Sequence, residues 1–138
     1  MNKVILVTGA AKRIGKQIAK EFFAIDFNII VHFNSSSEDA ISLCDELNAI
    51  RPNSAISIQA NLDHMNDVKN LASQAMSAFG RIDGLINNAS TFYPTPMGEF
   101  SEKDWDALMG SNLKAPLFLV QELHEELKRQ SGFVINVT

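Results

Sequence analysis

Thr8-Gly9-Ala10-Ala11-Lys12-Arg13-Ile14-Gly15 decides the fold, because it follows a continuous apolar run at Val4–Val7 and opens a helical pattern. Such a run is typical of a strand covered on both faces of a parallel sheet. The helix that follows offers free N–H groups and partial positive charge to a pyrophosphate. Gly9 permits the tight turn and Gly15 permits close packing, although Arg13 stands where such turns usually have a further glycine. The stretch predicts a dinucleotide-binding turn; a tight turn without ligand is the alternative.

The rest of the chain alternates between strand and helix patterns. We expect strands at 4–7, 28–33, 55–59, 84–87 and 133–137. We expect helices at 14–24, at 38–50 with Ser37 as N-cap, at 66–79, and as one long helix or a broken pair that begins near Ser101–Asp104 and runs to about 130. Right-handed βαβ units then predict an α/β fold of Rossmann type, a doubly wound parallel sheet in the order 3-2-1-4-5. The last strand would be an uncovered edge of buried-type sequence, so we expect further strands to follow it.

Composition limits the functional classes. The 138 residues fit one domain, and a net charge of −4 argues against nucleic acid as the main partner. A single cysteine, Cys44, permits no internal disulfide and no Cys-rich metal site, so we expect no metal. No apolar run reaches the length of about 18 residues that a membrane span needs, so we expect a cytoplasmic protein without membrane attachment.

Two further motifs are expected to place polar groups near the Thr8–Gly15 turn. Gly84-Leu85-Ile86-Asn87-Asn88-Ala89-Ser90 ends the fourth predicted strand, beside the first, in the crevice where open α/β sheets bind ligands. The alternative is a turn in which the two asparagines satisfy only backbone groups. Asn112 lies in an apolar helical stretch just before Pro116, where it could hold a kink, a water or an active-site backbone segment; otherwise it is a surface asparagine.

In this order and spacing, the three motifs and Gly80-Arg81-Ile82-Asp83 resemble the short-chain dehydrogenase/reductase family over all 138 residues. The resemblance implies an NAD(P)-binding domain over residues 1–138, the N-terminal part of a longer domain, and hydride transfer to a carbonyl or imine. It assigns Asn112 to the catalytic group. It assigns cofactor binding to Gly9, Lys12, Arg13, Ile14, Gly15, His32, Phe33, Asn34, Ser35, Asn61, Leu62, Asn88, Ala89 and Ser90.

A narrower similarity is to pteridine reductases. It rests on Ala10–Arg13, on Leu47–Ala49 with Arg51–Ile56, and on Asn87–Pro96. It implies that Arg13 and Ser90 contact cofactor and substrate, and that Phe92 covers a pterin ring, for which aromatic stacking is suitable chemistry. Loop packing is the alternative role for Phe92, and a 3-oxoacyl thioester reductase is the alternative enzyme.

The end of the second predicted strand bears on cofactor choice. It reads His32-Phe33-Asn34-Ser35-Ser36-Ser37 and lacks the acid that usually binds the ribose 2′-hydroxyl of NAD. Lys12 can reach the same region, so we expect NADP(H). Ser35 stands where pteridine reductases tend to carry arginine, which weakens that preference. We expect His32 to contact ribose or phosphate, and Asn61–Leu62 to lie against the adenine.

The resemblance also implies a tyrosine proton donor with a lysine four residues later, but the only tyrosine is Tyr93 and no Tyr-x-x-x-Lys occurs. One interpretation is a shortened reductase that is inactive by itself. The other is a binding or interaction module whose edge strand pairs with a partner. Family members usually form dimers or tetramers, so we expect homo-oligomers of the full-length protein, acting on a small pterin-like or carbonyl substrate.

Overall fold

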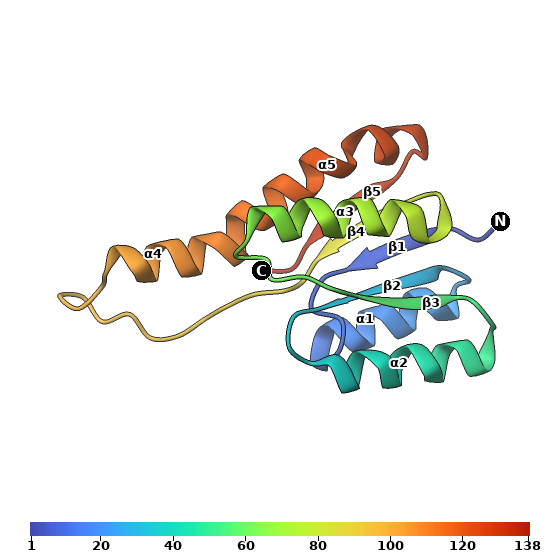
Figure 1. Ribbon diagram of the computed structural model, residues 1–138, viewed down its shortest axis with the longest axis horizontal. Helices are drawn as coiled ribbons and strands as arrows, with labels where there is room; N and C mark the ends of the chain where they lie inside the picture. Colours follow the sequence, from blue (N-terminus) through green and yellow to red (C-terminus); the bar gives the residue numbers. More distant parts are fainter.

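The computed structural model describes residues 1–138 as one five-stranded parallel sheet with helices on both faces (Figure 1). The strand order is β3-β2-β1-β4-β5, and every neighbouring pair is parallel. The strands are β1 (Val4–Val7), β2 (Asn28–Phe33), β3 (Ala55–Gln59), β4 (Gly84–Asn87) and β5 (Phe133–Asn136). The predicted Rossmann-type sheet order is confirmed.

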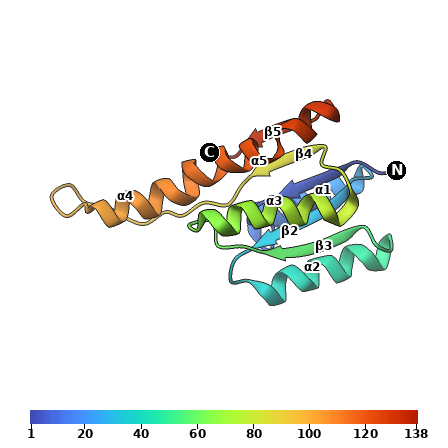
Figure 2. The ribbon, with the colours of Figure 1, turned by 45° about the horizontal axis from the view of Figure 1, so that its top comes forward.

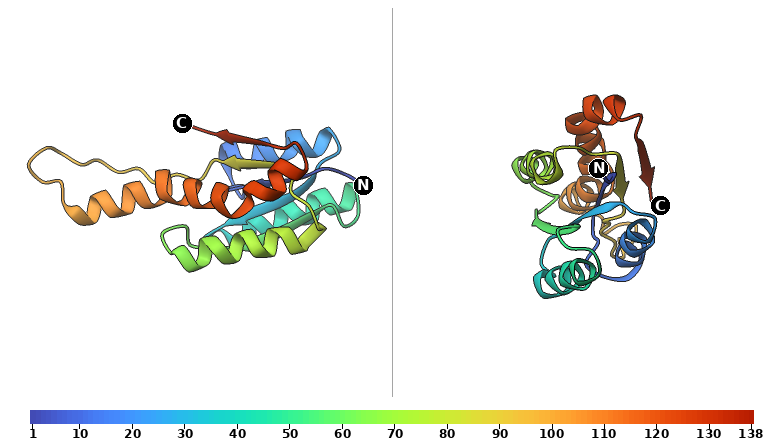
Figure 3. Two further views of the ribbon diagram at one scale, coloured as in Figure 1. Left: turned by 90° about the horizontal axis from the view of Figure 1, so that it is seen from above. Right: turned by 90° about the vertical axis from the view of Figure 1, so that its right-hand side faces the viewer.

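The helices divide between the two faces of the sheet. They are α1 (Arg13–Ala24), α2 (Ser37–Ile50), α3 (Met65–Phe79), α4 (Glu102–Met109) and α5 (Ala115–Arg129), with a π-helical turn, η1 (Gly110–Lys114), between the last two. Figure 2 shows α3 and α5 over one face, and the end-on view in Figure 3 shows α1 and α2 together on the other. This is the layering that right-handed crossovers on both sides of a parallel sheet produce.

The sequence of β1 explains why helices cover the sheet on both faces. All four of its side chains are fully buried. Successive side chains of a strand point to opposite faces, so Val4 and Leu6 join the core under α3 and α5, whereas Ile5 and Val7 join the core under α1 and α2. Each such burial stabilises the fold by roughly 1.5–3 kcal/mol, which anchors the turn that follows β1.

Three helices, α1, α2 and α3, begin one residue earlier than expected. Ser36, not Ser37, occupies the N-cap position of α2, and its side chain makes no capping hydrogen bond. The predicted start of α4 is confirmed: Ser101 Oγ accepts the N–H of Asp104, and the Asp104 carboxylate accepts the N–H of Ser101. That reciprocal pair satisfies two N–H groups that a helix start leaves free.

The stretch from α4 to α5 is one continuous helix that contains a π-helical turn, so it is neither a regular helix nor a broken pair. The turn at Gly110–Lys114 has helical backbone angles at both of its ends, and Pro116, which lacks an N–H, follows it in the first turn of α5. No residue of α4 is buried, and α4 with the loop before it projects beyond the sheet (Figure 3, left). Asn112 therefore lies on the π-helical turn, where it meets the loop after β4 at Thr91.

The last strand is an edge strand with an uncovered side. Phe133 stacks on Phe22 with ring centroids 5.8 Å apart, but Val134 and Ile135 are 36% and 45% exposed. The strand ends at Asn136, one residue earlier than expected, although the N–H of Val137 still donates to Asn87 O. None of the helices has both the length and the apolar character needed to cross a membrane.

Candidate dinucleotide-binding site

The turn after β1 takes the tight form that its glycines predict. Gly9 has φ +61°, in the left-handed region, and Arg13 begins α1 with φ +53°. A side chain on Gly15 would collide with the Gly9 carbonyl oxygen and lie 2.5 Å from Asn88 Nδ2. Gly15 is therefore needed for contact with the turn and with the loop after β4, more than for contact with the strand itself.

Hydrogen bonds that the Thr8 hydroxyl accepts join this turn to the loop after β4. Thr8 Oγ1 accepts the backbone N–H groups of Asn88 and Ala89, each at 3.0 Å, and Thr8 is 2% exposed. In return, Asn88 Nδ2 donates to the carbonyl oxygens of Thr8 and Gly9, both at 3.1 Å. The first two sequence motifs thus form one connected unit. The Asn88 side chain therefore satisfies backbone groups, as the alternative interpretation of this motif expects.

His32 holds the turn from the neighbouring strand. The N–H of Gly9 donates to His32 Nδ1 at 3.0 Å, so the proton is on Nε2, which donates to Ala60 O at 2.9 Å. Burial lowers the pKa of His32, against a smaller opposing effect of the Ala60 hydrogen bond, and the ring stays neutral at pH 7. Both ring nitrogens are thus engaged with backbone groups at the ends of β1 and β3.

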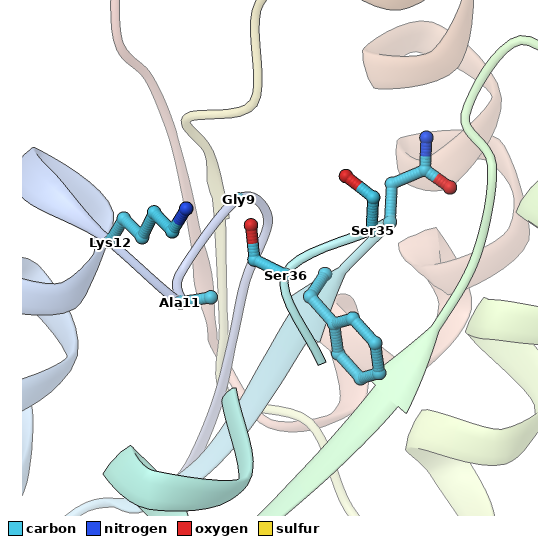
Figure 4. A pocket seen from close by; sticks show the side chains of 7 residues that line it. Gly9, Ala11, Lys12, Ser35 and Ser36 are labelled. Carbon is cyan, nitrogen blue, oxygen red and sulfur yellow. The ribbon is translucent and has the colours of Figure 1, made fainter. Parts of the chain in front are cut away.

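A first hollow, here called the nucleotide pocket, opens between the turn and the end of β2, with a volume of about 150 Å³. Its lining residues are Gly9, Ala11, Lys12, Phe33, Asn34, Ser35 and Ser36. Figure 4 shows the Lys12 side chain extending from the start of α1 toward Ser36. Lys12 also forms an ion pair with Asp39 in the first turn of α2, at 3.3 Å.

A second hollow, here called the central pocket, lies across the carboxyl ends of the strands and has a volume of about 180 Å³. It is lined by His32, Asn34, Asn61, Leu62, Asp63, Ala89, Ser90, Thr91 and Ser111. Asn61 is held on both sides: its N–H donates to Asp67 at 2.8 Å, and its side-chain oxygen accepts the N–H of Asp63 at 3.0 Å. Asn34 lines both pockets, so the two hollows lie next to each other at this end of the sheet.

Asn112 clamps the loop after β4. Its Oδ1 accepts the N–H of Thr91 at 2.9 Å and its Nδ2 donates to Thr91 O at 2.7 Å. Both polar atoms of the amide are used on one backbone residue, and that residue lines the central pocket beside Ser90. Of the three roles considered for Asn112, the contacts support the holding of a backbone segment.

The loop beyond Thr91 is anchored by Tyr93, whose hydroxyl donates to Asp104 Oδ1 at 2.9 Å. Partial burial, followed by the Asp104 hydrogen bond, raises the pKa of Tyr93. Hydrogen bonds from Ser101 and from Tyr93 lower the pKa of Asp104. Phe92, by contrast, is 88% exposed and lines neither pocket.

Ten of the fourteen expected cofactor residues line the two pockets: Gly9, Lys12, His32, Phe33, Asn34, Ser35, Asn61, Leu62, Ala89 and Ser90. Arg13 and Ile14 lie outside them on the exposed start of α1, and Ile14 is 63% exposed. Sequence reasoning missed Thr8, Ala11, Ser36, Asp63, Thr91 and Ser111. Thr8 and Ala11 belong to the Thr8–Gly15 motif, and Ser36 and Thr91 directly follow expected residues. The sequence signal that could have found them is their position next to residues already expected in the site.

The family follows from a comparison with known proteins. The family model described as "short chain dehydrogenase" matches residues 3–138. The chain belongs to this family. Short-chain dehydrogenases similar to it include a 3-oxoacyl-[acyl-carrier-protein] reductase, FabG, of Staphylococcus epidermidis, 33% identical over 100% of the chain and 57% of the relative. Pteridine reductase 1 of Leishmania tarentolae is 37% identical over 86% of the chain and 52% of the relative.

A solved structure shares the fold of this short-chain dehydrogenase. The blue fluorescent protein from a metagenomic library, in complex with NADPH, superposes with a TM-score of 0.92 and 32% identity. That match covers 97% of the chain and 54% of the other protein. The chain thus spans little more than half the length of these relatives.

Proposed function

We propose that this chain binds NADP(H) along the nucleotide and central pockets, as the cofactor-binding part of a short-chain reductase. The observation that carries the proposal is the hydrogen-bonded unit of Thr8, Gly9, Asn88 and Ala89, which ends two adjacent strands beside both pockets. Ligands of open α/β sheets bind at this kind of strand-order reversal. Bound NADPH would supply the hydride.

The preference for the 2′-phosphate rests on the nucleotide pocket. Its lining contains one cation, Lys12, two serine hydroxyls and no carboxylate. A cation attracts a 2′-phosphate, whereas an acid at the end of β2 would favour the ribose 2′-hydroxyl of NADH. The NADPH complex of the blue fluorescent relative supports the same choice.

In the proposed reductase, Asn112 acts through the loop after β4. Its two hydrogen bonds hold Thr91, and through it the backbone of Ser90, at the edge of the central pocket. The 138 residues contain no tyrosine followed four positions later by lysine. We therefore propose that the 138 residues bind cofactor without turnover. Intact-mass analysis beside an NADPH-oxidation assay tests this: binding without oxidation is expected, and turnover of dihydrobiopterin by a 138-residue species would contradict it.

For the substrate, we propose a pterin or a similar flat heteroaromatic ring. The exposed ring of Phe92 lies two residues beyond Ser90, with Tyr93 next to it tied to Asp104, and an exposed aromatic ring is suited to stacking. The pteridine reductase relative, at 37% identity, supports this class.

A 3-oxoacyl thioester is the second candidate, because FabG relatives match the whole chain at 33% identity. The two classes separate in a competition experiment on the full-length protein with NADPH bound. Methotrexate should displace the substrate if it is a pterin. Competition by a 3-oxoacyl thioester but not by methotrexate would reject the pterin proposal.

We also propose that the full-length protein is a cytoplasmic dimer or tetramer. The support is an uncovered apolar face on the α4–α5 segment, where Trp105, Leu113 and Leu117 are 54%, 57% and 59% exposed. Light scattering on the full-length protein measures the assembly directly, and a monomer at micromolar concentration would contradict the proposal.

A further inference from the structure

We infer that Asp39 tunes how strongly the nucleotide pocket favours a dinucleotide with a 2′-phosphate over one without, by holding Lys12. Asp39 Oδ2, in the first turn of α2, lies 3.3 Å from Nζ of Lys12, which precedes α1 and lines the pocket. The inference rests on the proposed function, because it concerns the same cofactor pocket.

Lys12 is the only charged residue in the lining of the pocket. Selectivity for the additional phosphate therefore depends on one ammonium group together with Ser35 and Ser36. In the structure that ammonium group already has an acidic partner. A ligand phosphate must share Lys12 with Asp39 or displace it, whereas a ligand without the 2′-phosphate has no such competition.

The ion pair is weak enough to be displaced. The side chains of Lys12 and Asp39 are 57% and 52% exposed, and exposed ion pairs contribute little to stability because water and salt screen them. Lys12 nevertheless has to leave or share its acidic partner before it can bind a phosphate. We expect this competition for the ammonium group to lower the affinity for the 2′-phosphate about three- to tenfold in low salt.

Glu38 provides a matched control. It carries the same charge, lies in the same first turn of α2 and is also exposed, but it forms no ion pair with Lys12. Glu38→Gln therefore changes the net charge and the helix-start electrostatics as Asp39→Asn does, without releasing Lys12. A difference between the two variants isolates the contact with Lys12 from the general loss of a negative charge.

The test compares 2′,5′-ADP with 5′-AMP, the adenosine ends of NADP and NAD, by NMR titration of the 138-residue chain in low salt. Such titrations follow affinities into the millimolar range. Asp39→Asn should raise the ratio of 2′,5′-ADP to 5′-AMP affinity about three- to tenfold, and Glu38→Gln less than about twofold. In a Lys12→Gln background, the effect of Asp39→Asn should fall to that of Glu38→Gln. Unfolding midpoints of all variants check that each is folded.

The outcomes separate the two proposals. An Asp39→Asn ratio no higher than that of Glu38→Gln, with both nucleotides bound, would overturn the role of Asp39 and leave the proposed function standing. A gain kept in full without Lys12 would show that Asp39 does not act through that residue, and would also overturn the inference. Failure of the unmodified chain to bind either nucleotide would reject the proposed function and this inference with it.

Discussion

Replacement of Thr8 by valine removes the hydroxyl that joins the turn after β1 to the loop after β4, while the size and shape of the side chain are kept. Thr8 Oγ1 accepts two N–H groups at 3.0 Å, from Asn88 and Ala89, and the Thr8 side chain is buried. Valine can accept neither bond, and its methyl group would face both donors.

The size of the effect follows from the two donors. An unsatisfied buried N–H costs about 1–3 kcal/mol. Asn88 and Ala89 are half-buried, so water can reach them in part, and the lower half of that range applies. We expect Thr8→Val to lower the free energy of unfolding by about 2–4 kcal/mol, a large part of the total of about 5–15 kcal/mol that is usual for a folded protein.

Urea unfolding followed by far-ultraviolet circular dichroism measures this difference by linear extrapolation. Thr8→Ser is the matched control, because it keeps the hydroxyl and removes one methyl group, at a cost of about 1 kcal/mol. If Thr8→Val were as stable as Thr8→Ser, or more stable, the hydroxyl would not be what joins the two segments.

Three further predictions concern the same region and the core. Gly15→Ala should abolish measurable NADPH binding, because the added methyl group would lie 2.5 Å from Asn88 Nδ2; unchanged affinity in a titration would contradict the close approach. Asn112→Leu removes both hydrogen bonds to Thr91 and should destabilise the fold by about 1–3 kcal/mol in urea unfolding, whereas no loss would refute the clamp. Burial raises the pKa of Cys44 to about 11, so the thiol should react with a disulfide reagent at pH 8 far more slowly in folded than in unfolded protein, and equal rates would contradict its burial.

The sequence predicts the sheet well because the strands are buried on both faces. The bounds of the first four strands agree with the expected ranges, since runs such as Val4–Val7 leave little choice of structure. The uncovered edge position of β5 also follows from the predicted strand order, but its end does not: the strand ends at Asn136, one residue earlier than expected, because pairing depends on the neighbouring strand rather than on local sequence.

The candidate site was predicted in outline but not in its contacts. The hydroxyl of Thr8 gains its role only when β4 pairs with β1, and a pairing across almost 80 positions of sequence leaves no local signal. The ring of His32 was expected to face the ligand, yet both its nitrogens bind backbone groups. The ion pair of Lys12 with Asp39 joins two helices and likewise depends on the folded arrangement.

The central claim is that the turn, the end of β2 and the loop after β4 form one dinucleotide site. The most direct measurement is an NMR titration of the isotope-labelled 138-residue chain with NADPH, in which every assigned backbone amide is followed. The account predicts saturable shifts concentrated at Gly9–Ile14, Asn34–Ser36 and Asn88–Thr91, the segments that form or adjoin the two pockets. Shifts confined to α4 and the loop before it, or no shifts at millimolar NADPH, would contradict it.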